Sequence, residues 1–493
     1  MSLSQHIPTE SSEKVDEYGT HEKQLTHEVL EVDDWTAEDE VLAKRGLRRV
    51  DLSVIVTFAI VYMMSFLDRS NIGNANLTGF STDLGLVGNQ YGAAVSVVYS
   101  TYVFFEPTAS VLVKIVTPKV MITFCTLAWA VITIGSAFIK NYDQLLAVRI
   151  LLGIFEAGMI PTINLFLSMT YNRDEYVTRQ IFIYFANCMS GAFGGLLAYG
   201  LSQIHASGLH GWQWMYLVEG LISICLVPLA WFMIPNEATQ CRFLKPAERA
   251  AMEKRRIRNR RIYDERDKFT WGALLAAVKD FRVYFMCISQ FGMLCTVYSL
   301  TTFMPSIVAG LGFTTRVQAQ LLTVPVYVIA AVGFAIAGFF SDRYKIRSPF
   351  ILASNICNLI GFIMLAASDR VGVRYAGCFI GCIGLYAGGT LNNMWCADNF
   401  GPHYKRALSM GMMQFIGNTA GAIIGFIFTT HTAPRYLKGL HFDVGMTCVS
   451  FLCTCTNALY ARHMNKKKRE MIAAGAPDDP SLGDKNPHYL WFM

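Results

Sequence analysis

The chain has 493 residues, of which 53% are hydrophobic and only 16% are charged, and its mean hydropathy is +0.35. These values exclude a set of water-soluble domains, because a soluble surface needs more charge, and they indicate a polytopic membrane protein. The net charge of +6 does not indicate a nucleic-acid partner, since the basic residues flank apolar segments, as membrane topology requires.

The N-terminal segment, residues 1–49, is polar and strongly acidic over its first forty residues. It is too long and too acidic for a signal peptide, so we expect the first apolar run to act as the insertion signal. Thr36 followed three residues later by Asp39 is an N-cap pattern. This pattern predicts a short surface helix that ends near Arg49.

Twelve apolar runs long enough to cross a bilayer follow this segment, in two sets of six. Their approximate bounds are 50–72, 91–113, 120–139, 146–170, 180–203 and 212–234, then 283–309, 318–340, 349–367, 374–396, 406–429 and 443–462. The sequence therefore predicts an all-α membrane protein with six-helix bundles at 50–234 and 283–462. Between them lies a basic linker, 235–282, which must be aqueous. Two halves joined in this way are typical of a transporter built from parallel repeats.

The orientation follows from Lys and Arg, which are concentrated before the first run and in the loops after even-numbered runs. By the positive-inside rule, both termini and the linker are cytosolic. The end of the chain, 463–493, is then a cytosolic tail. Its section 473–486 is rich in Pro, Gly and Asp, which predicts disorder. Asn76 begins a glycosylation sequon on the external side.

Two runs carry stripes of glycine. Gly417, Gly421 and Gly425 share one face of the eleventh run, and Gly191 with Gly195 do so in the fifth. Such stripes let helices approach closely. The stripes have two interpretations: static packing of the helices, or contacts that permit the two bundles to rock against each other.

Two acids and two arginines lie inside apolar runs of the first half, where each charge costs about 2.5 to 3.5 kcal/mol at bilayer depth. Asp68 and Arg69 are consecutive, so their side chains point about 100° apart and one can face a cavity while the other faces a helix. Arg149 and Glu156 are seven positions apart and project from one helix face, about 10 Å apart along the axis. The four charges are formally neutral together.

This arrangement suggests a coupling mechanism. An organic anion would compete with Asp68 or Glu156 for an arginine, and a carboxylate that loses its cation at low dielectric takes up a proton. Anion and proton would then move together. The alternative is that the charges form interhelical pairs that orient the first and fourth helices; however, buried pairs are a poor source of stability.

Other polar residues in the runs have two interpretations each. Glu106 precedes Pro107, which is expected to kink the helix so that Glu106 faces a cavity; the alternative is a packing role. The second half carries amides in place of charges, and these either bind a polar substrate or link helices. They are Gln290, Asn392, Asn393, Gln414 and Asn418.

Motifs for other chemistry are missing from the sequence. His21 and His27 are six positions apart, which does not fit a metalloprotease helix, and no Walker loop is present. Most of the 13 cysteines fall in apolar runs without a histidine cluster, so they are interpreted as small buried hydrophobic residues. We therefore expect no metal, no cofactor and no enzymatic activity.

Three motifs resemble a known family: Leu67-Asp68-Arg69-Ser70-Asn71, then Arg149-x3-Gly153-x2-Glu156, and the stretch 405–418. Over about 44–462 the chain resembles the anion:cation symporter family of the major facilitator superfamily, especially its fungal allantoate permease branch. The resemblance implies alternating access and proton-coupled transport of small organic anions such as allantoate, nicotinate, pantothenate or biotin.

The resemblance also implies roles for individual residues. Asp68 and Glu156 are implied as proton sites and Arg69 as the anion site, with Arg149 as a partner that can pair with an acid. With the polar positions above, the predicted substrate-binding residues are Arg69, Arg149, Asn71, Glu106, Asn392 and Asn418.

The loop between the eighth and ninth runs contains Gly338, Asp342, Arg343 and Arg347 in the pattern Gly-x3-Asp-Arg-x3-Arg. This pattern resembles a loop motif of the superfamily and predicts a cytosolic gate. The corresponding loop of the first half, 110–119, lacks the aspartate, which argues against a symmetric gate.

The sequence thus predicts a plasma-membrane symporter, monomeric as in the superfamily, that uses the proton gradient to move a small carboxylate. An exporter of an organic acid or secondary metabolite on the same fold is the main alternative, because the sequence does not fix the direction of flux. A nutrient sensor on a transporter scaffold is a second alternative, although the tails lack a signalling domain. The substrate itself is not predicted.

Overall fold

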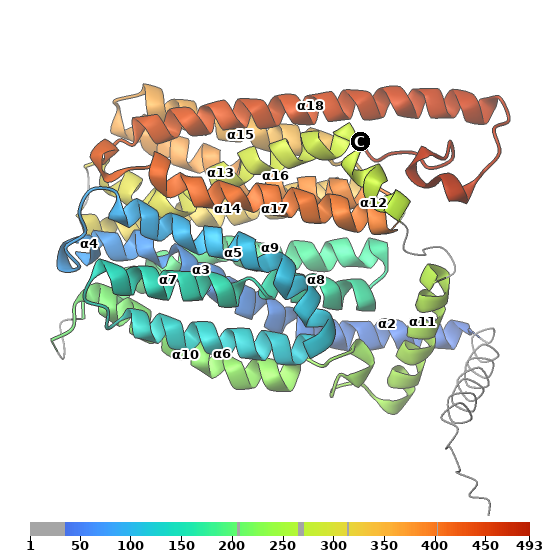
Figure 1. Cartoon of the computed structure of the whole chain (residues 1–493), viewed down its shortest axis with the longest axis horizontal. Helices are drawn as coiled ribbons and strands as arrows, with labels where there is room; N and C mark the ends of the chain where they lie inside the picture. Colours follow the sequence, from blue (N-terminus) through green and yellow to red (C-terminus); the bar gives the residue numbers. More distant parts are fainter. Residues whose placement is uncertain (1–34, 205–207, 265–270, 313–314, 402) are drawn as a thin grey trace, which may run out of the picture. The chain divides into compact units, whose positions relative to one another are not determined.

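The computed structural model describes residues 35–204, 208–264, 271–312, 315–401 and 403–493 (Figure 1). These residues form helices and loops, with no strand among them. The predicted acidic segment falls largely on 1–34, outside the described residues, as do His21 and His27. The chain divides into two compact units, Met1–Ser53 with Glu237–Lys268, and Val54–Asn236 with Phe269–Met493.

The first unit pairs α2 (Ala37–Val50) with the linker helix α11 (Pro246–Asp264), next to the short η2 (Ala238–Gln240). The predicted N-cap of α2 is present: the hydroxyl of Thr36 accepts from the backbone N–H of Asp39, and the Asp39 carboxylate accepts from that of Thr36. Arg49 pairs with Glu248 of α11 at 3.1 Å, and Lys254 pairs with Asp39 at 3.2 Å. Ion pairs thus link α2 to α11 within this unit.

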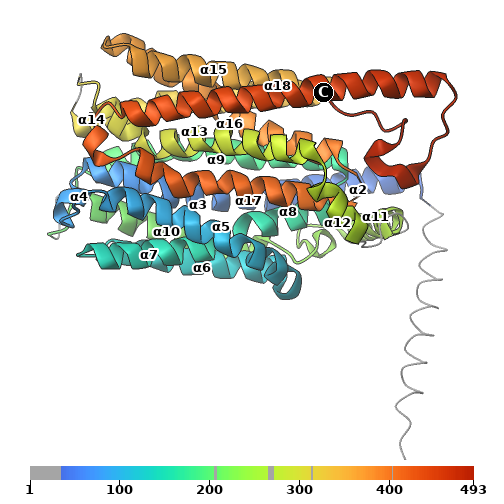
Figure 2. The same cartoon turned by 45° about the horizontal axis from the view of Figure 1, so that its top comes forward.

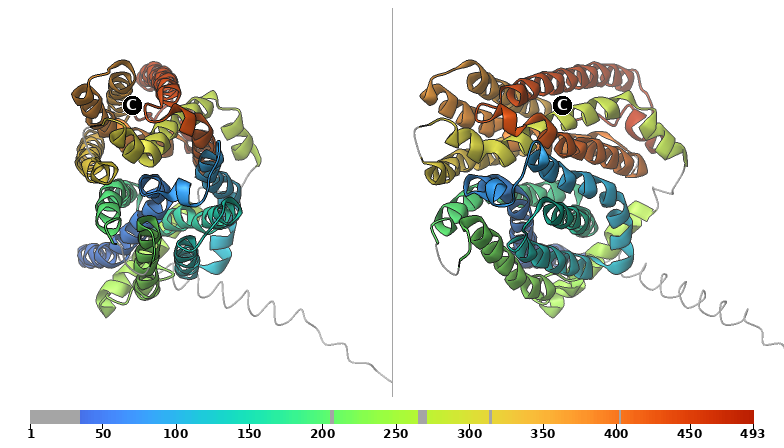
Figure 3. Two further views of the ribbon diagram at one scale, coloured as in Figure 1. Left: turned by 90° about the vertical axis from the view of Figure 1, so that its left-hand side faces the viewer. Right: turned by 60° about the vertical axis from the view of Figure 1, so that its left-hand side comes forward.

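The second unit contains both predicted bundles (Figure 3). A π-helix, η1 (Asp51–Ile55), leads into its first helix. The first bundle comprises α3 (Val56–Leu77), α5 (Gln90–Val116), α6 (Pro118–Ser136), α7 (Tyr142–Glu156) with α8 (Met159–Thr170), α9 (Arg173–Leu201) and α10 (Gly211–Met233), with the short α4 (Phe80–Asp83) after α3. The second comprises α13 (Phe281–Ala309), α14 (Arg316–Tyr344), α15 (Ser348–Ala367), α16 (Val371–Asn399), α17 (His403–Ile427) and α18 (Leu437–Ala473), preceded by α12 (Trp271–Val278). The short η3 (Thr430–Thr432) precedes α18, and η4 (Pro480–Lys485) follows it. Figure 2 shows α15 and α18 side by side.

Each of the twelve predicted runs coincides with a helix or with the α7–α8 pair. Within the described part of the chain, 11 helical segments are long and apolar enough to cross a membrane. The twelfth, α5, is 27 residues long, but Glu106, Pro107 and several hydroxyl side chains lower its hydropathy. It packs against α7 in its own half and α17 in the other, so polarity here marks a helix at the interface of the halves.

The predicted glycine stripes lie where helices of the two halves approach most closely. A Cβ atom on Gly92 of α5 would lie 2.0 Å from the carbonyl oxygen of Gly425 of α17, a distance that no side chain permits. Gly421 packs on the ring of Tyr99, and Gly191 of α9 packs on Tyr327 of α14. The close approach predicted from the stripes is therefore confirmed, whereas rocking of the bundles stays a prediction.

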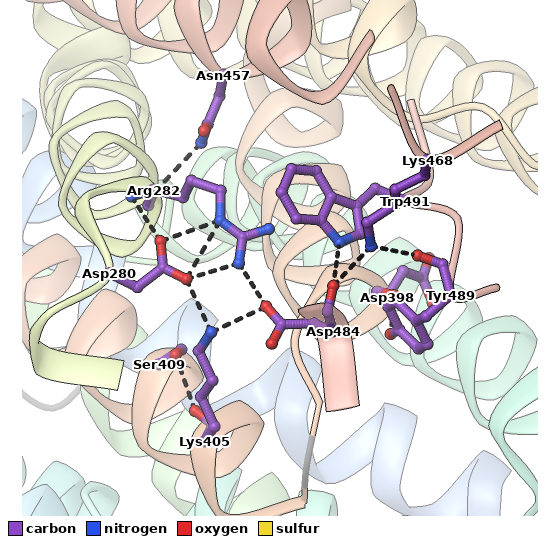
Figure 4. Close-up of polar contacts among 10 residues, drawn as sticks. All are labelled: Asp280, Arg282, Asp398, Lys405, Ser409, Asn457, Lys468, Asp484, Tyr489 and Trp491. Atoms are coloured by element: carbon purple, nitrogen blue, oxygen red, sulfur yellow. Dashed lines mark hydrogen bonds and ion pairs between the residues drawn. The ribbon is translucent and has the colours of Figure 1, made fainter. Parts of the chain in front are cut away.

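The prediction that 473–486 is disordered is wrong. After α18 the chain turns back through η4 and packs on the end of the second bundle (Figure 4). Asp484 is only 3% exposed and accepts from Arg282 and, at 2.8 Å, from Lys405. Both bases also bond Asp280, so the four side chains form one buried cluster. Composition predicted turns correctly but could not reveal that this aspartate has partners 79 and 202 residues away.

The last residues complete this contact. The ring of Trp491 lies 3.9 Å from the guanidinium of Arg282, and Lys468 donates to the carbonyls of Asp484 and Tyr489, each at 2.7 Å. Burial alone would raise the pKa of Asp280, but hydrogen bonds and charge from Arg282 and Lys405 hold it below its ordinary value. Asp280 therefore stabilises the protein at pH values above the ordinary pKa of an aspartate. This stabilisation is lost as the pH falls through the lowered pKa.

Asp484→Asn is expected to destabilise the protein by about 3 kcal/mol, because it leaves two buried cations to share one carboxylate. Thermal unfolding of the detergent-solubilised protein measures this. Asp369→Asn is the matched control, since Asp369 is 85% exposed and pairs with Arg435 at the surface; its effect is expected to stay below about 1 kcal/mol. Equal unfolding temperatures for the two variants would contradict the buried cluster.

Candidate functional site

A polar cavity of about 780 Å³, including its open part, lies between the two halves of the second unit. The lining residues come from α3, α5, α7, α8 and α9 of the first half and from α13, α16 and α17 of the second. Each half thus contributes part of the site.

One buried ion pair borders this cavity. Arg69 of α3 donates from Nε and Nη2 to the same oxygen, Oε2, of Glu156 at the end of α7, at 2.8 and 2.5 Å. The guanidinium lies over the ring of Tyr102, 4.6 Å from its centroid. The other oxygen of Glu156 has no hydrogen-bond partner among the described residues. The pair is therefore only partly satisfied and leaves one carboxylate oxygen open to a proton.

Asp68 points away from the cavity that Arg69 borders, so the two side chains diverge as their consecutive positions predicted. It is 1% exposed and does not line the cavity. Its Oδ2 accepts from the hydroxyl of Ser223 on α10 at 3.5 Å, while Oδ1 has no partner within the described part of the chain. Any exchange of protons between Asp68 and the cavity must therefore pass through other groups.

Four predicted substrate-binding residues are not among those that line the cavity, and their roles as substrate ligands stay predictions: Arg149, Asn71, Asn392 and Glu106. Arg149 is buried and donates to the hydroxyl of Tyr216 at 2.8 Å. Asn71 of α3 is buried and does not line the cavity. Its side-chain amide has no hydrogen-bond partner among the described residues. Asn392 donates to Gln290 at 2.8 Å and so links two helices. For these three residues helix rotation, which the sequence does not specify, directs the side chain into the packing.

Two predicted residues meet across the two halves. Asn418 of α17 lines the cavity, donates to Glu106 of α5 at 3.1 Å and accepts from the hydroxyl of Tyr298 at 2.8 Å. Asn393, next to Asn392 on α16, faces the cavity instead of its neighbour. Consecutive helical positions diverge by about 100°, so only one of the two amides can face the substrate space.

Sequence reasoning missed the tyrosines of the cavity. Five of them line it, from both halves: Tyr62, Tyr102, Tyr184, Tyr298 and Tyr386. Together with Phe66 and Leu294 they give it flat apolar walls with hydroxyl groups, next to one cation. Tyrosines inside membrane runs, away from the interfaces where they are usual, were the available signal.

Two acids in membrane helices were also missed. Glu219 of α10 and Asp443 of α18 are completely buried. Asp443 accepts from the hydroxyl of Ser299 at 2.5 Å. Each is a lone acid in an apolar run, the same signal that singled out Asp68.

The predicted gate motif forms a charge network at the end of α14. Arg347 is buried and bonds Asp342 and Asp398, each at 3.2 Å, while Arg343 is exposed. A Cβ atom on Gly338 would lie 3.3 Å from Ile181 of α9, so the motif packs on the other half. Gating by these residues stays a prediction.

Two smaller predictions concern modification and metals. Asn76 lies in the last turn of α3, where its side-chain oxygen accepts from Ser81 at 2.5 Å; its glycosylation stays a prediction. No group of three potential metal ligands occurs among the residues that the structure describes.

Two helical halves around a central polar cavity with a buried ion pair define a secondary membrane transporter. The chain belongs to the Major Facilitator Superfamily, which it matches over residues 58–426. It is a multi-pass membrane protein that transports a small molecule, and its relatives are transporters, not enzymes.

Individual relatives support this assignment. The chain is 37% identical to the high-affinity nicotinic acid transporter of Saccharomyces cerevisiae, over 98% of this chain and 90% of the relative. It is 38% identical to an uncharacterized transporter of Schizosaccharomyces pombe, over 92% and 93% of the two chains. With the MFS-type transporter cnsO of Penicillium expansum it shares 32% identity, over 86% and 85%.

Solved structures confirm the fold. A bacterial homolog of the human lysosomal transporter Spinster, in an inward-facing and unoccupied conformation, superposes with a TM-score of 0.63, covering 83% of this chain and 98% of that one at 14% identity. A D-xylose-proton symporter gives 0.62, covering 82% and 97% at 14% identity. At such identities the likeness shows the fold alone.

Proposed function

We propose that this transporter carries a small aromatic monocarboxylate, with nicotinate as the representative, together with a proton into the cell across the plasma membrane. The observation that carries the proposal is Arg69, a buried cation that borders a cavity walled by tyrosines. The similarity to a nicotinic acid transporter over nearly the whole chain supports the same substrate class. The positive-inside pattern supports cytosolic termini.

The cavity matches the two ends of such a substrate. A carboxylate can accept two parallel hydrogen bonds from a guanidinium, the strongest neutralising contact available to it in a dry site. A flat ring fits between aromatic side chains in stacked or edge-to-face contact. Amides from helices of the second half, Asn393, Gln414 and Asn418, also line the cavity and can bond a ring nitrogen without adding charge.

Proton coupling follows from the ion pair. A substrate carboxylate that binds Arg69 displaces Glu156, which is completely buried and loses its ion pair with Arg69. An unpaired carboxylate at low dielectric is costly, so Glu156 takes up a proton. The substrate and the proton then cross as a neutral set of charges, and release of one favours release of the other.

Uptake of radiolabelled nicotinate by cells that lack their own nicotinate transport, with and without expression of this chain, tests the proposal. We expect uptake that is faster at acid external pH and is inhibited by excess nicotinate or benzoate. Nicotinamide, which has the same ring without the charge, and lactate, which has the charge without the ring, should inhibit weakly. Equal inhibition by nicotinamide would overturn the role of Arg69, and faster efflux than uptake would favour the exporter.

Movement of the two halves can be tested at their tightest contact. Gly92→Val is expected to lose most uptake while the protein still reaches the membrane, because the new side chain keeps α5 and α17 from closing. Gly135→Ala in α6 is the control, since nothing lies within 4 Å of the added atom. Initial uptake rates per molecule at the cell surface measure both variants. Normal transport by Gly92→Val would show that this closed contact is not part of the cycle.

A further inference from the structure

Glu219 of α10 is a buried acid that lies outside the cavity. It is 0% exposed, it does not line the cavity, and neither of its carboxylate oxygens has a hydrogen-bond partner among the described residues. A buried carboxylate without a hydrogen-bond partner is among the most costly side chains that a membrane helix can carry. A residue of this kind requires a reason other than packing.

The neighbours of Glu219 on its own helix lead to Asp68. Ser223, one turn further along α10, donates to Asp68 at 3.5 Å. Positions four apart share a helix face, so Glu219 lies on the face that packs against α3. The two carboxyl groups interact electrostatically with each other. Tyr216, about one turn before Glu219, binds Arg149 through its hydroxyl.

The charges of the first half do not balance. Among the charged residues that lie at least seven positions from the ends of its membrane spans, with α7 and α8 taken as one span, the acids are Asp68, Glu106, Glu156 and Glu219, and the bases are Arg69 and Arg149. Arg69 pairs with Glu156. The other charged groups that act on the pair formed by Asp68 and Glu219 are Glu156 and Arg149, and neither forms a hydrogen bond with it. Two buried carboxyls on contacting helices, neither bonded to a cation, repel each other when both are ionised, which favours a state in which the pair holds a proton.

We propose that Glu219, on the same face of α10 as Ser223, which binds Asp68, sets the proton affinity of Asp68 behind the cavity. This inference rests on the proposed proton coupling. A negative charge on Glu219 makes ionisation of Asp68 more costly, because both carboxyls are buried at low dielectric. Glu219 acts through Asp68 and does not touch the substrate. Because Asp68 lies away from the cavity, this pair supplies a proton store separate from Glu156.

The test compares the wild-type protein with Glu219→Gln. Each is purified, reconstituted into proteoliposomes and studied in two assays with labelled nicotinate. Exchange of nicotinate without a gradient reports on binding and helix movement, and is expected to stay within about twofold of wild type. Accumulation driven by an acid exterior reports on coupling, and is expected to fall by about tenfold with a flattened pH profile, the effect of a change of one pKa unit or more at Asp68. Glu219→Asp should restore part of the accumulation.

Asp443→Asn is the matched control, since it removes a buried acid from the sixth membrane helix of the other half, where Asp443 is held by Ser299. It should keep the wild-type pH profile. A wild-type pH profile and accumulation in Glu219→Gln would overturn the proposal. So would equal loss of exchange and accumulation without recovery in Glu219→Asp, since that indicates a packing role. Absence of acid-driven accumulation in the wild-type protein would instead reject the proposed function, and this inference with it.

Discussion

Arg69→Gln is expected to reduce nicotinate uptake by about 100-fold or more. The substitution removes the cation that borders the cavity, and loss of one partner of a buried, hydrogen-bonded charge pair costs about 2 to 5 kcal/mol. It also leaves Glu156 without a cation, so the site holds a neutral acid where it needs a positive charge. Initial rates at several substrate concentrations, normalised to protein at the cell surface, measure the effect.

Two further variants define the cause. Arg69→Lys keeps the charge but loses the planar pair of donors, so intermediate uptake with a raised KM is expected. Arg370→Gln removes an exposed arginine at the start of α16, outside the predicted gate motif, and serves as the control for loss of one positive charge. Wild-type KM and rate in Arg69→Gln would show that the substrate carboxylate binds elsewhere.

Glu156→Gln is expected to transport nicotinate at a rate that does not depend on external pH and without accumulation against a gradient. Glutamine can still accept from Arg69 but cannot take up a proton when the substrate displaces it. Exchange of labelled for unlabelled nicotinate should persist, because it needs no net proton movement. Uptake measured across external pH, with and without a protonophore, separates these behaviours.

Asp143→Asn is the control for this variant, since Asp143 is exposed in the first turn of the same helix, α7. It is expected to retain both pH dependence and accumulation. Concentrative, fully pH-dependent uptake in Glu156→Gln would rule out the proton role of Glu156 and would leave Asp68 with Glu219 as the coupling site.

The membrane helices could be predicted from the sequence because a bilayer imposes a length of about 20 apolar residues on each. The divergence of Asp68 and Arg69 followed equally from helix geometry. Both inferences use local information, and the structure confirms both: Arg69 borders the cavity and Asp68 faces α10.

The cavity itself could not be predicted in full, because its wall is assembled from eight helices whose rotations depend on tertiary packing. Asn392 and Asn393 are equivalent in the sequence, yet only Asn393 faces the substrate space. The docked tail was missed for a similar reason. Nothing local to Asp484 indicates Arg282 and Lys405 as its partners.

The central proposal is that anion and proton cross together, and the movement of both can be measured at once. Purified protein is placed in vesicles that contain a pH-sensitive dye, at equal pH on both sides, and labelled nicotinate is added outside. We predict that the lumen acidifies as nicotinate enters, at a fixed ratio of protons to anions, and that vesicles with Arg69→Gln or without protein show neither. Entry of nicotinate through the wild-type protein without acidification would contradict the proposal.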